Sequence, residues 1–530
     1  MKESTRIFCV LAGFAVLSIG IPSQSEAQVA SNQGPDHIDK TGDAIVATGA
    51  GLGPNETSLA NAVELLCPKL VARVPGSTAV PTTVPLSSGG ATSPTVNVPT
   101  SNIANPQQVV QQFLEGRAPV SGDPRSPQEI DLQRRCTELV QYRKRTQGSS
   151  SQYTGLNTVL REMNMDEAAA QGRGLVEFSA IRVLAVATRL QKLRLADAGN
   201  SGTMVAFQPD SGRFTYNFET GGGAGDDSFS RWTVYGNGAL SSGSRDTTTL
   251  ESGYDLSGGR ATVGADYRVS NTLFVGASLD YISTTADFTN DSKLDTDGYD
   301  VTLYGTTYTD SGLYFQGTIG AGSNDYTQHR RIQFTVPGVP GPLGTGPAPT
   351  TVNQTALGDT SGSQFFASAG VGKDINAGRG MTGNLSATLD YLDASIDGFT
   401  ESIDNTNPGF GMALTVSDQT VKSLRSTVGA QLSKAISTTS GVVQPYARAN
   451  WIHEFDNGSR SIIARFASDS IDTTAFELTT NSPNQDYFRL GGGVSAVFPH
   501  GLQAFVSVDT VLGLSNFNYY SITAGLSKEL

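Results

Sequence analysis

The sequence predicts a membrane-spanning antiparallel β-barrel over residues 230–530, preceded by a small α-helical and partly disordered region. Three observations predict this class. From about Arg231 onward, apolar and polar residues alternate with a period of two. The alternating segments are about ten residues long, which is enough for a tilted strand to cross a bilayer. Tight turns alternate with long polar loops, the usual arrangement of outer-membrane barrels.

The period-two segments each place apolar residues on one face and small or charged residues on the other. The clearest run puts Leu273, Val275, Leu279 and Tyr281 on one side and Asp280 on the other. Similar runs cover 260–268, 313–319, 488–498 and 520–526. We expect roughly twelve strands, closed into a cylinder because lipid cannot satisfy an open strand edge.

Turns and aromatic residues support a membrane barrel. A tight turn is expected at 268–271, and long polar loops are expected at 322–361 and 395–417. Aromatic residues recur near strand ends, where the lipid–water interfaces would lie. These residues are Trp232, Tyr235, Tyr281, Tyr391, Trp451, Phe455 and Phe498.

Composition narrows the class of function. The chain of 530 residues has a formal net charge of −13, which argues against binding nucleic acid because phosphates require Lys and Arg. Gly occurs 60 times, and only 38% of residues are hydrophobic. This composition favours strands and tight turns over a helix-rich enzyme.

The first 27 residues are predicted to be a signal peptide. Lys2 and Arg6 are followed by the apolar run 7–21, and Ser25-Glu26-Ala27 then places small residues at the cleavage-site positions. Cleavage would remove Cys9 and leave Cys67 and Cys136 in an oxidising compartment. We expect these two to form a disulfide, which would stabilise the fold by about 4 kcal/mol. The alternative is two unpaired thiols.

Two further regions precede the barrel. Residues 28–155 form an N-terminal helical and low-complexity region, with amphipathic segments around Cys67 and Cys136 and a Pro/Thr/Ser/Gly-rich run between them. Residues 156–229 form a helical linker. This helix either packs as an ordinary amphipathic helix or threads the barrel as a plug, since 20 helical residues span about 30 Å.

Several charged residues fall on the polar face of the predicted strands and would point into the lumen. They are Arg260, Asp266, Arg268, Arg448, Glu454 and Arg489. Buried charges need partners. We therefore predict lumen ion pairs that either hold a plug segment or tune a pore.

No pattern of catalytic or metal-binding residues stands out. The four histidines, His37, His329, His453 and His500, are scattered without zinc-site spacing. Acidic residues such as Glu401 are assigned to solvated loops rather than to a Ca²⁺ site. The sequence contains no Gly-x-Ser-x-Gly elbow or phosphate loop. We expect no catalytic activity, no cofactor and no metal.

Four runs carry a resemblance to a known family. They are Gly258–Tyr281, the sequence Gln444-Pro445-Tyr446-Ala447-Arg448 with the following Trp451 to Phe455, Asp486–Val494 and Ile522–Leu526. Over residues 230–530 the chain resembles the autotransporter (type V secretion) β-domain. The terminal residues depart from the family pattern, since the chain ends in Leu530 rather than an aromatic residue. The region before the barrel also lacks the long repetitive passenger common in this family.

The resemblance implies a monomeric twelve-stranded barrel in the outer membrane of a Gram-negative cell, with a segment passing through its pore. It also implies contact with outer-membrane lipid and insertion by periplasmic chaperones and the barrel-assembly machinery.

The leading hypothesis is a barrel that anchors, and translocates, its own short N-terminal region, which would lie in the periplasm or at the cell surface. Two alternatives stay open. One is a porin-like channel plugged by the N-terminal helix. The other is a surface adhesin that acts through the long loops around 338–351.

Overall fold

The computed structural model describes residues 53–72, 81–82, 96–97, 125–145, 158–198, 207–208, 213–214, 231–336, 349–469, 474–498 and 501–530. The predicted signal peptide, 1–27, lies outside these residues. So do most of the Pro/Thr/Ser/Gly-rich run and most of the segment that joins the linker helix to the barrel.

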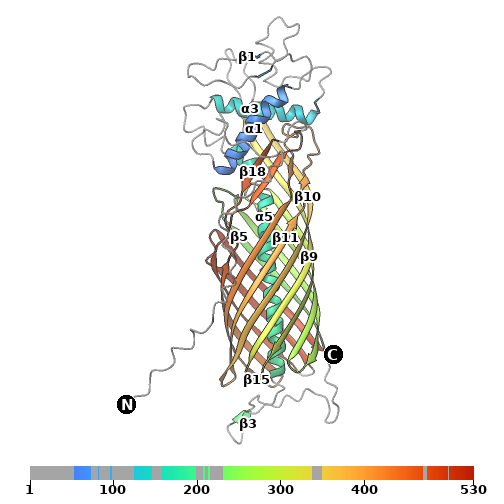
Figure 1. Cartoon of the computed structure of the whole chain (residues 1–530), viewed down its shortest axis with the longest axis vertical. Helices are drawn as coiled ribbons and strands as arrows, with labels where there is room; N and C mark the ends of the chain where they lie inside the picture. Colours follow the sequence, from blue (N-terminus) through green and yellow to red (C-terminus); the bar gives the residue numbers. More distant parts are fainter. Residues whose placement is uncertain are drawn as a thin grey trace, which may run out of the picture.

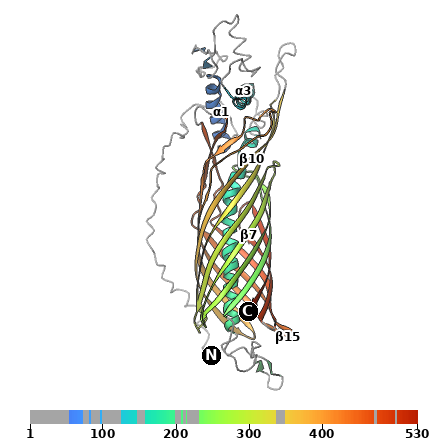
Figure 2. The same cartoon turned by 90° about the vertical axis from the view of Figure 1, so that its right-hand side faces the viewer.

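Twelve antiparallel strands close into a barrel, as predicted (Figures 1 and 2). Consecutive strands pair in sequence order, and β21 pairs with β5 to complete the ring. The strands are β5 Trp232–Arg245, β6 Tyr254–Ser270, β7 Leu273–Phe288, β8 Lys293–Tyr308, β9 Leu313–Val336, β10 Thr350–Gly378, β11 Met381–Ile396, β14 Gln419–Lys434, β16 Gly441–Glu454, β19 Asp486–Val497, β20 Leu502–Leu512 and β21 Phe517–Glu529.

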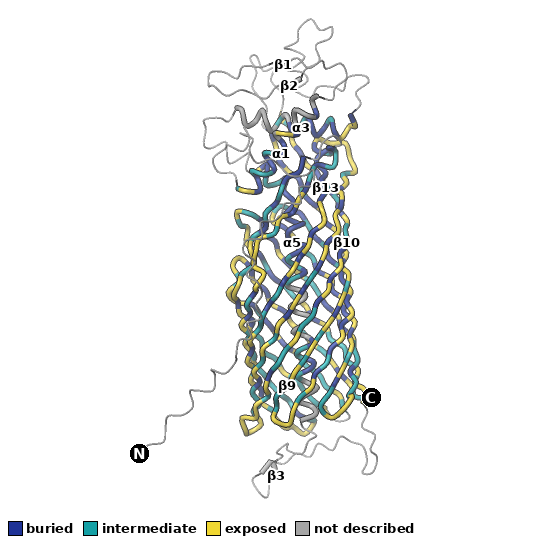
Figure 3. The backbone as a smooth tube through the Cα atoms, in the orientation of Figure 1, coloured by how far each residue is buried: buried dark blue, intermediate teal, exposed yellow. Residues whose placement is uncertain are grey.

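The outer wall of the barrel carries the apolar side of the predicted alternation. Leu279 is 58% exposed and Leu526 is 60% exposed, whereas the residues that follow them, Asp280 and Ser527, are buried. Figure 3 shows the same alternation of exposed and buried positions along the strands. Large apolar side chains turned outward on a closed sheet are explained by lipid, because water would oppose such a surface.

One of the aromatic residues assigned to the interfaces is placed differently. Trp232 and Trp451 are exposed on the outside, as expected. Tyr235 instead points into the lumen, where its hydroxyl lies 2.8 Å from the hydroxyl of Tyr304. The reason is strand parity: Trp232 and Val234 face outward on β5, so the odd-numbered Tyr235 faces inward.

The apolar face of the β9–β10 hairpin changes sides along its length. Near the turn at 379–380 the apolar side chains of these strands face outward, and Ile319 on β9 is 50% exposed. Farther along β9, Ile332 and Phe334 are buried inside, and the outward positions are polar, as at Gln333. The change lies between the cross-strand pairs Ala321↔Phe365 and Ser323↔Ser363. Beyond that level the polar outer face of the hairpin is suited to contact with water rather than with lipid.

The prediction of a loop at 322–361 is therefore wrong for most of these residues. β9 continues to Val336 and β10 begins at Thr350, so only 337–349 separates them. The polar residues that indicated a loop are the outward face of a strand pair in water. Their inward neighbours supply the apolar face of a core.

The arrangement of turns identifies the two ends of the barrel. The end that carries the C-terminus has tight connections, such as 271–272, where a tight turn was predicted, and 379–380. The longest connections, 337–349, 397–418 and 455–485, lie at the other end. Outer-membrane barrels have short periplasmic turns and long extracellular loops. The end opposite the C-terminus is therefore the extracellular mouth.

A four-stranded sheet forms within the extracellular connections. Its strands are β12 Phe399–Thr400, β13 Leu414–Val416, β17 Ser461–Phe466 and β18 Ala475–Thr479. The segment 395–417, expected to be a long polar loop, thus contains two strands. Leu414 and Val416 are each 1% exposed, because their side chains join the core at the mouth.

Two helices sit on this mouth (Figure 1). They are α1 Pro54–Ala72 and α3 Pro127–Arg145. Pro127 at the first helical position suits a helix start. Ser126 and Glu129 form a reciprocal capping box: each side chain accepts a hydrogen bond from the other residue's backbone N–H, at 2.8 and 3.1 Å.

We define the cap as α1, α3, the segment 158–165 and the four-stranded sheet. Leu59, Leu66 and Leu132 from the helices share one hydrophobic cluster with Ile332 and Phe466 from the strands. Because these side chains share one cluster, the cap forms one packed unit with the extracellular strands.

Among the described residues, no helix is long and apolar enough to cross a membrane.

A third helix, α5 Asp166–Ala198, lies inside the barrel along its axis (Figures 1 and 2). Asp166 and Glu167 place acidic side chains at its N-terminal end, as the helix dipole favours. The remaining described elements are short: β1 Pro81–Thr82 with β2 Val96–Asn97, β3 Phe207–Gln208 with β4 Arg213–Phe214, and β15 Ile436–Thr438.

Candidate functional site

The candidate site is the lumen, where α5 contacts the barrel wall at several levels. Near the periplasmic end, Arg189 donates from Nε to Asp266 on β6 at 2.9 Å. Tyr304 on β8 donates to the second oxygen of Asp266 at 2.8 Å. The guanidinium of Arg189 also lies 4.7 Å from the ring centroid of Tyr235. These contacts bind one side of the helix to β5, β6 and β8.

A second ion pair lies across the lumen. Arg448 on β16 donates to both carboxylate oxygens of Asp509 on β20, and its Nη2–Oδ2 distance is 2.7 Å. Its remaining terminal nitrogen, Nη1, donates to Thr188 on α5 at 2.8 Å. The carboxylate of Asp509 on the wall thus neutralises the charge of Arg448, and the hydroxyl of Thr188 connects Arg448 to α5, the helix that fills the lumen as a plug. A planar guanidinium is suited to this double role.

Polar contacts continue up the helix. Arg425 on β14 donates to the backbone carbonyl of Val176 at 3.3 Å. Gln171 on α5 bridges two walls: its amide oxygen accepts from Gln419 at 3.2 Å, and its amide nitrogen donates to Gln328 at 3.3 Å. Hydrogen bonds therefore connect α5 to the barrel wall at positions from Gln171 to Arg189.

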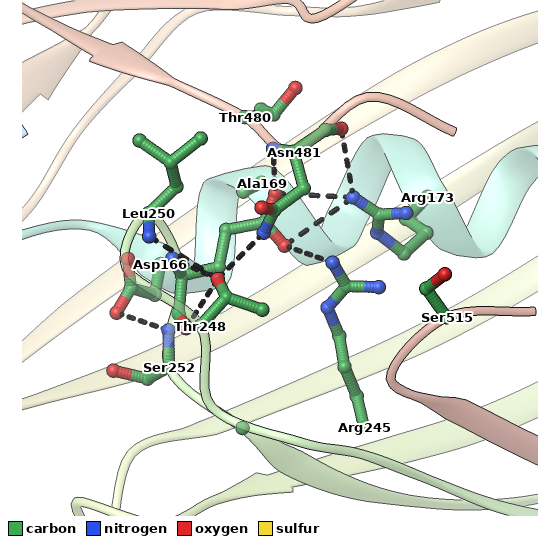
Figure 4. A network of polar contacts seen from close by, with 12 residues as sticks. Asp166, Ala169, Arg173, Arg245, Thr248, Leu250, Ser252, Thr480, Asn481 and Ser515 are labelled. Atoms are coloured by element: carbon green, nitrogen blue, oxygen red, sulfur yellow. Dashed lines mark hydrogen bonds and ion pairs between the residues drawn. The ribbon is translucent and has the colours of Figure 1, made fainter. Parts of the chain in front are cut away.

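At the extracellular mouth, a polar network that includes Arg173, Arg245 and Asn481 lies beside the upper part of α5 (Figure 4). Glu251 contacts α5 within this network. It lies in the β5–β6 connection and forms ion pairs with Arg173 on α5 and Arg245 on β5, each at 3.1 Å. The backbone N–H of Asn481 donates to it at 2.7 Å. Burial alone would raise the pKa of Glu251, but the two guanidiniums and this N–H outweigh burial and lower it.

Arg460 adds a second contact at this level. Its guanidinium donates to the carbonyl of Ala169 at 3.2 Å and lies against Gly172 of α5, where a Cβ would collide with it. Burial and the neighbouring Arg173 lower the pKa of Arg460 to about 10. A glycine at 172 thus allows an arginine from the 455–485 connection to lie on the helix.

A buried ion pair joins the segment before α5 to the extracellular strands. Arg330 on β9 donates to both oxygens of Glu401, at 2.8 and 2.6 Å, and to the carbonyl of Met163 at 3.2 Å. Glu401 also accepts the N–H of Leu414 at 2.8 Å. The assignment of Glu401 to a solvated loop is therefore wrong: its side chain is 0% exposed, because 397–418 folds inward over the mouth.

The six predicted lumen charges differ in what they contact. Asp266 and Arg448 contact α5 directly, as described above. Arg260 and Arg489 are buried on the wall, and each retains at least one side-chain nitrogen that has no hydrogen-bond partner among the described residues. Arg268 lies at the periplasmic end, with its guanidinium 5.1 Å from the ring centroid of Phe274.

Glu454 contacts the wall rather than the helix, accepting from Ser423 at 2.6 Å and from the N–H of Leu424 at 3.0 Å. The general role assigned to the six predicted lumen charges, holding a plug or tuning a pore, stays a prediction.

Several residues of the site are not singled out by the sequence. Arg173 and Arg189 look like ordinary charges of an amphipathic helix, and no motif marks Asp509, Arg330 or Tyr304. Extending the strand parity would find Asp509, because Ser507 and Asp509 fall on the polar face of β20. For the helix residues, no local signal indicates which wall carboxylate each would meet.

The two cysteines lie on neighbouring helices. Cys136 on α3 is 2% exposed, and its Sγ lies 3.2 Å from the carbonyl oxygen of Val63 on α1. The side chain of Cys67, also on α1, lies outside the described residues. The Cys67–Cys136 disulfide therefore stays a prediction. In the described part of the chain, no group of three or more metal-ligating side chains could hold a metal ion.

Comparison with known proteins was made on sequence and on structure. A family model described as the autotransporter beta-domain matches residues 234–509. Comparison with curated proteins finds no match.

Solved structures with similar barrels include three autotransporter domains. The translocator domain of NalP from Neisseria meningitidis is 16% identical, with 57% of this chain and 90% of that chain covered and a TM-score of 0.43. The beta domain of the Bordetella autotransporter BrkA is 17% identical, with 57% and 100% covered and a TM-score of 0.38. The transport unit of AIDA-I from Escherichia coli is 15% identical, with 58% and 92% covered and a TM-score of 0.36.

The family match covers more than half of the chain and lies within the twelve-stranded barrel, from β5 into β20. The chain therefore belongs to the autotransporter beta-domain family, and its barrel is a translocator domain of the outer membrane.

Proposed function

We propose that the barrel carries its own N-terminal region across the outer membrane and keeps it docked at the extracellular mouth as a cap. In this proposal residues 1–27 are the signal peptide, 28–155 are the transported region, 156–229 are the linker that includes the plug helix, and 230–530 are the translocator. The proposal assigns the chain no catalytic activity and no cofactor.

The direction of α5 is the observation that carries the proposal. The N-terminal end of α5 lies at the extracellular mouth, and the barrel's first strand, β5, begins at the opposite end (Figure 1). The described helices that precede α5, α1 and α3, lie on the extracellular side. Since α5 lies inside the barrel, the covalent path to these helices passes through the lumen. Transport of the N-terminal region explains this arrangement.

Retention is supported by the contacts of α1. The side chain of Asn55 accepts the N–H of Thr479 at 2.8 Å and donates to its carbonyl at 3.1 Å, and Ser58 accepts the N–H of Glu477 at 2.8 Å. Thr479 and Glu477 belong to β18, the edge strand of the small sheet. α1 therefore satisfies an edge that would otherwise be open. A passenger destined for release would not complete the fold of its own translocator.

Insertion is assigned to the general pathway for such barrels. We propose that periplasmic chaperones and the barrel-assembly machinery deliver the chain as a monomer into outer-membrane lipid. The apolar outer wall supports the lipid contact.

The test is surface exposure of the transported region. An epitope inserted near Asn102 should be removed by external protease in intact cells, and the cap should stay with the cells rather than in the medium. As a control, an epitope in the periplasmic turn at Arg379–Gly380 should stay protected until the membrane is opened. If the Asn102 epitope is protected in the same way, the helical region is periplasmic and the proposal is wrong.

Conductance separates this proposal from a porin-like channel. A translocator filled by α5 and covered by the cap should conduct weakly in planar bilayers. Removal of residues 28–225 should give large, steady openings. Equal conductance with and without these residues would favour the channel.

A further inference from the structure

Glu167 places a carboxyl group inside the packed extracellular mouth, in the first turn of α5. The residue is 1% exposed. Within the part of the chain that the structure describes, neither of its side-chain oxygens has a hydrogen-bond partner. An ionised carboxylate in such a place loses its hydration without gaining hydrogen bonds, whereas a neutral acid loses much less.

The cation that faces Glu167 is committed to other acceptors. Arg330 on β9 lies within electrostatic reach of Glu167. Its Nε and Nη2 atoms donate to the two oxygens of Glu401, and its Nη1 atom donates to the carbonyl of Met163. Because Glu401 already neutralises Arg330, an ionised Glu167 would be a buried charge without a counter-charge of its own.

The remaining surroundings of Glu167 oppose its ionisation further. The adjacent Asp166 is also buried, and it accepts the N–H of Ser252 at 3.0 Å (Figure 4). A negative charge on Asp166 repels one on Glu167. The other charged groups packed around this end of α5 are Glu251 in the β5–β6 connection, Arg161 and Glu162 in the segment 158–165, and Asp291 in the β7–β8 connection.

These surroundings shift the titration of Glu167. Burial raises the pKa of Glu167 to about 8, and the nearby Ser292 hydroxyl and Arg330 offset only part of this effect. Burial likewise raises the pKa of Asp166 to about 6. A carboxyl group whose pKa is raised by folding stabilises the folded state below its ordinary pKa. That contribution is lost as the pH rises toward the folded pKa.

We propose that Glu167 is a pH-sensitive switch at the extracellular mouth. As a neutral acid it allows the first turn of α5 and the segment 158–165 to pack under the cap. Its ionisation loosens this segment, including the contact of Arg330 with the carbonyl of Met163. The proposal is independent of whether the N-terminal region is exported, because it concerns only contacts within the folded chain.

The experiment compares the full mature chain with Glu167→Gln, whose amide has the shape of the neutral acid and cannot ionise. Trypsin is added to the membrane-inserted protein at several pH values from about 6.5 to 9, and cleavage after Arg161 is followed by mass spectrometry. Glu167→Gln should be cleaved more slowly. The ratio of the two rates should grow by up to about tenfold per pH unit until about pH 8 and then stay constant, because opening releases one proton below the folded pKa. Comparison at each pH cancels the pH dependence of trypsin itself.

Asp291→Asn is the matched control. Asp291 is exposed in the β7–β8 connection beside Ser292, and its φ of 63° is one that Asn adopts readily. This variant should be cleaved like the unchanged chain at every pH.

Infrared spectroscopy tests the switch without cleavage. In the unchanged chain, the band of a protonated carboxyl group should disappear between about pH 7 and 9, and Glu167→Gln should lack this change. Three results would each overturn the switch: a ratio of cleavage rates that is constant with pH, faster cleavage of Glu167→Gln, or an unchanged chain whose carboxyl band does not respond to pH.

Discussion

Arg189 of the plug helix donates from Nε to Asp266 of strand β6 at 2.9 Å, and both side chains are nearly excluded from solvent, at 8% and 2% exposure. The second oxygen of Asp266 accepts the hydroxyl of Tyr304, so neither partner keeps an exposed charge. A buried pair of this kind costs more to break by removing one partner than it contributes as a whole. It therefore fixes where α5 lies rather than merely adding stability.

Asp266→Asn should destabilise the plugged state by about 3–5 kcal/mol, because it leaves the Arg189 guanidinium buried and unpaired. The double variant Arg189→Gln/Asp266→Asn should recover much of this loss. Urea unfolding followed by Trp fluorescence measures both. Lys422→Gln breaks a largely exposed pair with Asp393, so a change within about 0.5 kcal/mol is expected. Equal losses in the buried and exposed variants would contradict the assignment.

The contact of Glu251 with Arg173 predicts a dependence on acid. The pKa of Glu251 lies below its ordinary value of 4.5 in the folded chain. Its contribution to stability is therefore present above that ordinary value and is lost as the pH falls through the folded pKa. Protease resistance of the mouth should decline below about pH 4.5.

Glu251→Gln should be less resistant at pH 7 and should lose this part of the pH dependence. Asp246→Asn, in the same connection but exposed, serves as the control and should leave the profile unchanged. An acid profile that is identical in the Glu251 variant would mean that another group is responsible.

The cap should depend on buried positions of α1. Leu66 is 1% exposed and belongs to the shared cluster, whereas its neighbour Leu65 is 47% exposed. Leu66→Ala should cost about 2–5 kcal/mol of cap stability through lost burial and a cavity. Leu65→Ala should cost less than about 0.5 kcal/mol. Limited proteolysis of outer-membrane fractions compares the two. Similar digestion rates would show that α1 is not docked as described.

The two mature cysteines should be oxidised. Cys136 is buried on α3 beside α1, the helix that carries Cys67. We expect no thiol of the mature chain to react with an alkylating reagent until a reductant is added, and reduction to weaken the cap by about 4 kcal/mol. Mass spectrometry of the alkylated chain counts the thiols. Two reactive thiols in the folded, unreduced chain would exclude the bridge.

The change of apolar face on β9 can be tested within that one strand. Ile319 lies in the lipid-facing part, and Gln333 lies on the same outward face beyond the change. Ile319→Lys should destabilise the barrel by about 2–4 kcal/mol, because it places a charge in lipid. Gln333→Lys should be neutral, because water surrounds it. The stability of both variants is measured by the heat-modifiable gel migration of the membrane-inserted chain. Equal destabilisation by the two substitutions would disprove the boundary between the lipid-facing and water-facing parts of β9.

The sequence by itself determined the barrel and its lipid face. Strand parity is a local property: once residue 279 faces outward, residue 280 must face inward, and this holds without knowledge of any neighbour. For the same reason the alternation within their own strands is enough to assign Asp266 and Arg448 to the lumen. Tyr235 is the exception, because its aromatic character suggests an interface while the parity of its strand turns it inward.

The tertiary structure alone decided which lumen groups meet and what covers the mouth. Arg189 and Asp266 are 77 residues apart, and Arg448 is 260 residues from Thr188. No local pattern encodes pairings at such separation. They follow from the rotation and height of α5, which packing against the whole wall fixes. Likewise, polar residues at 322–361 indicate a loop when taken alone. They form one side of a strand only because the cap covers the other side.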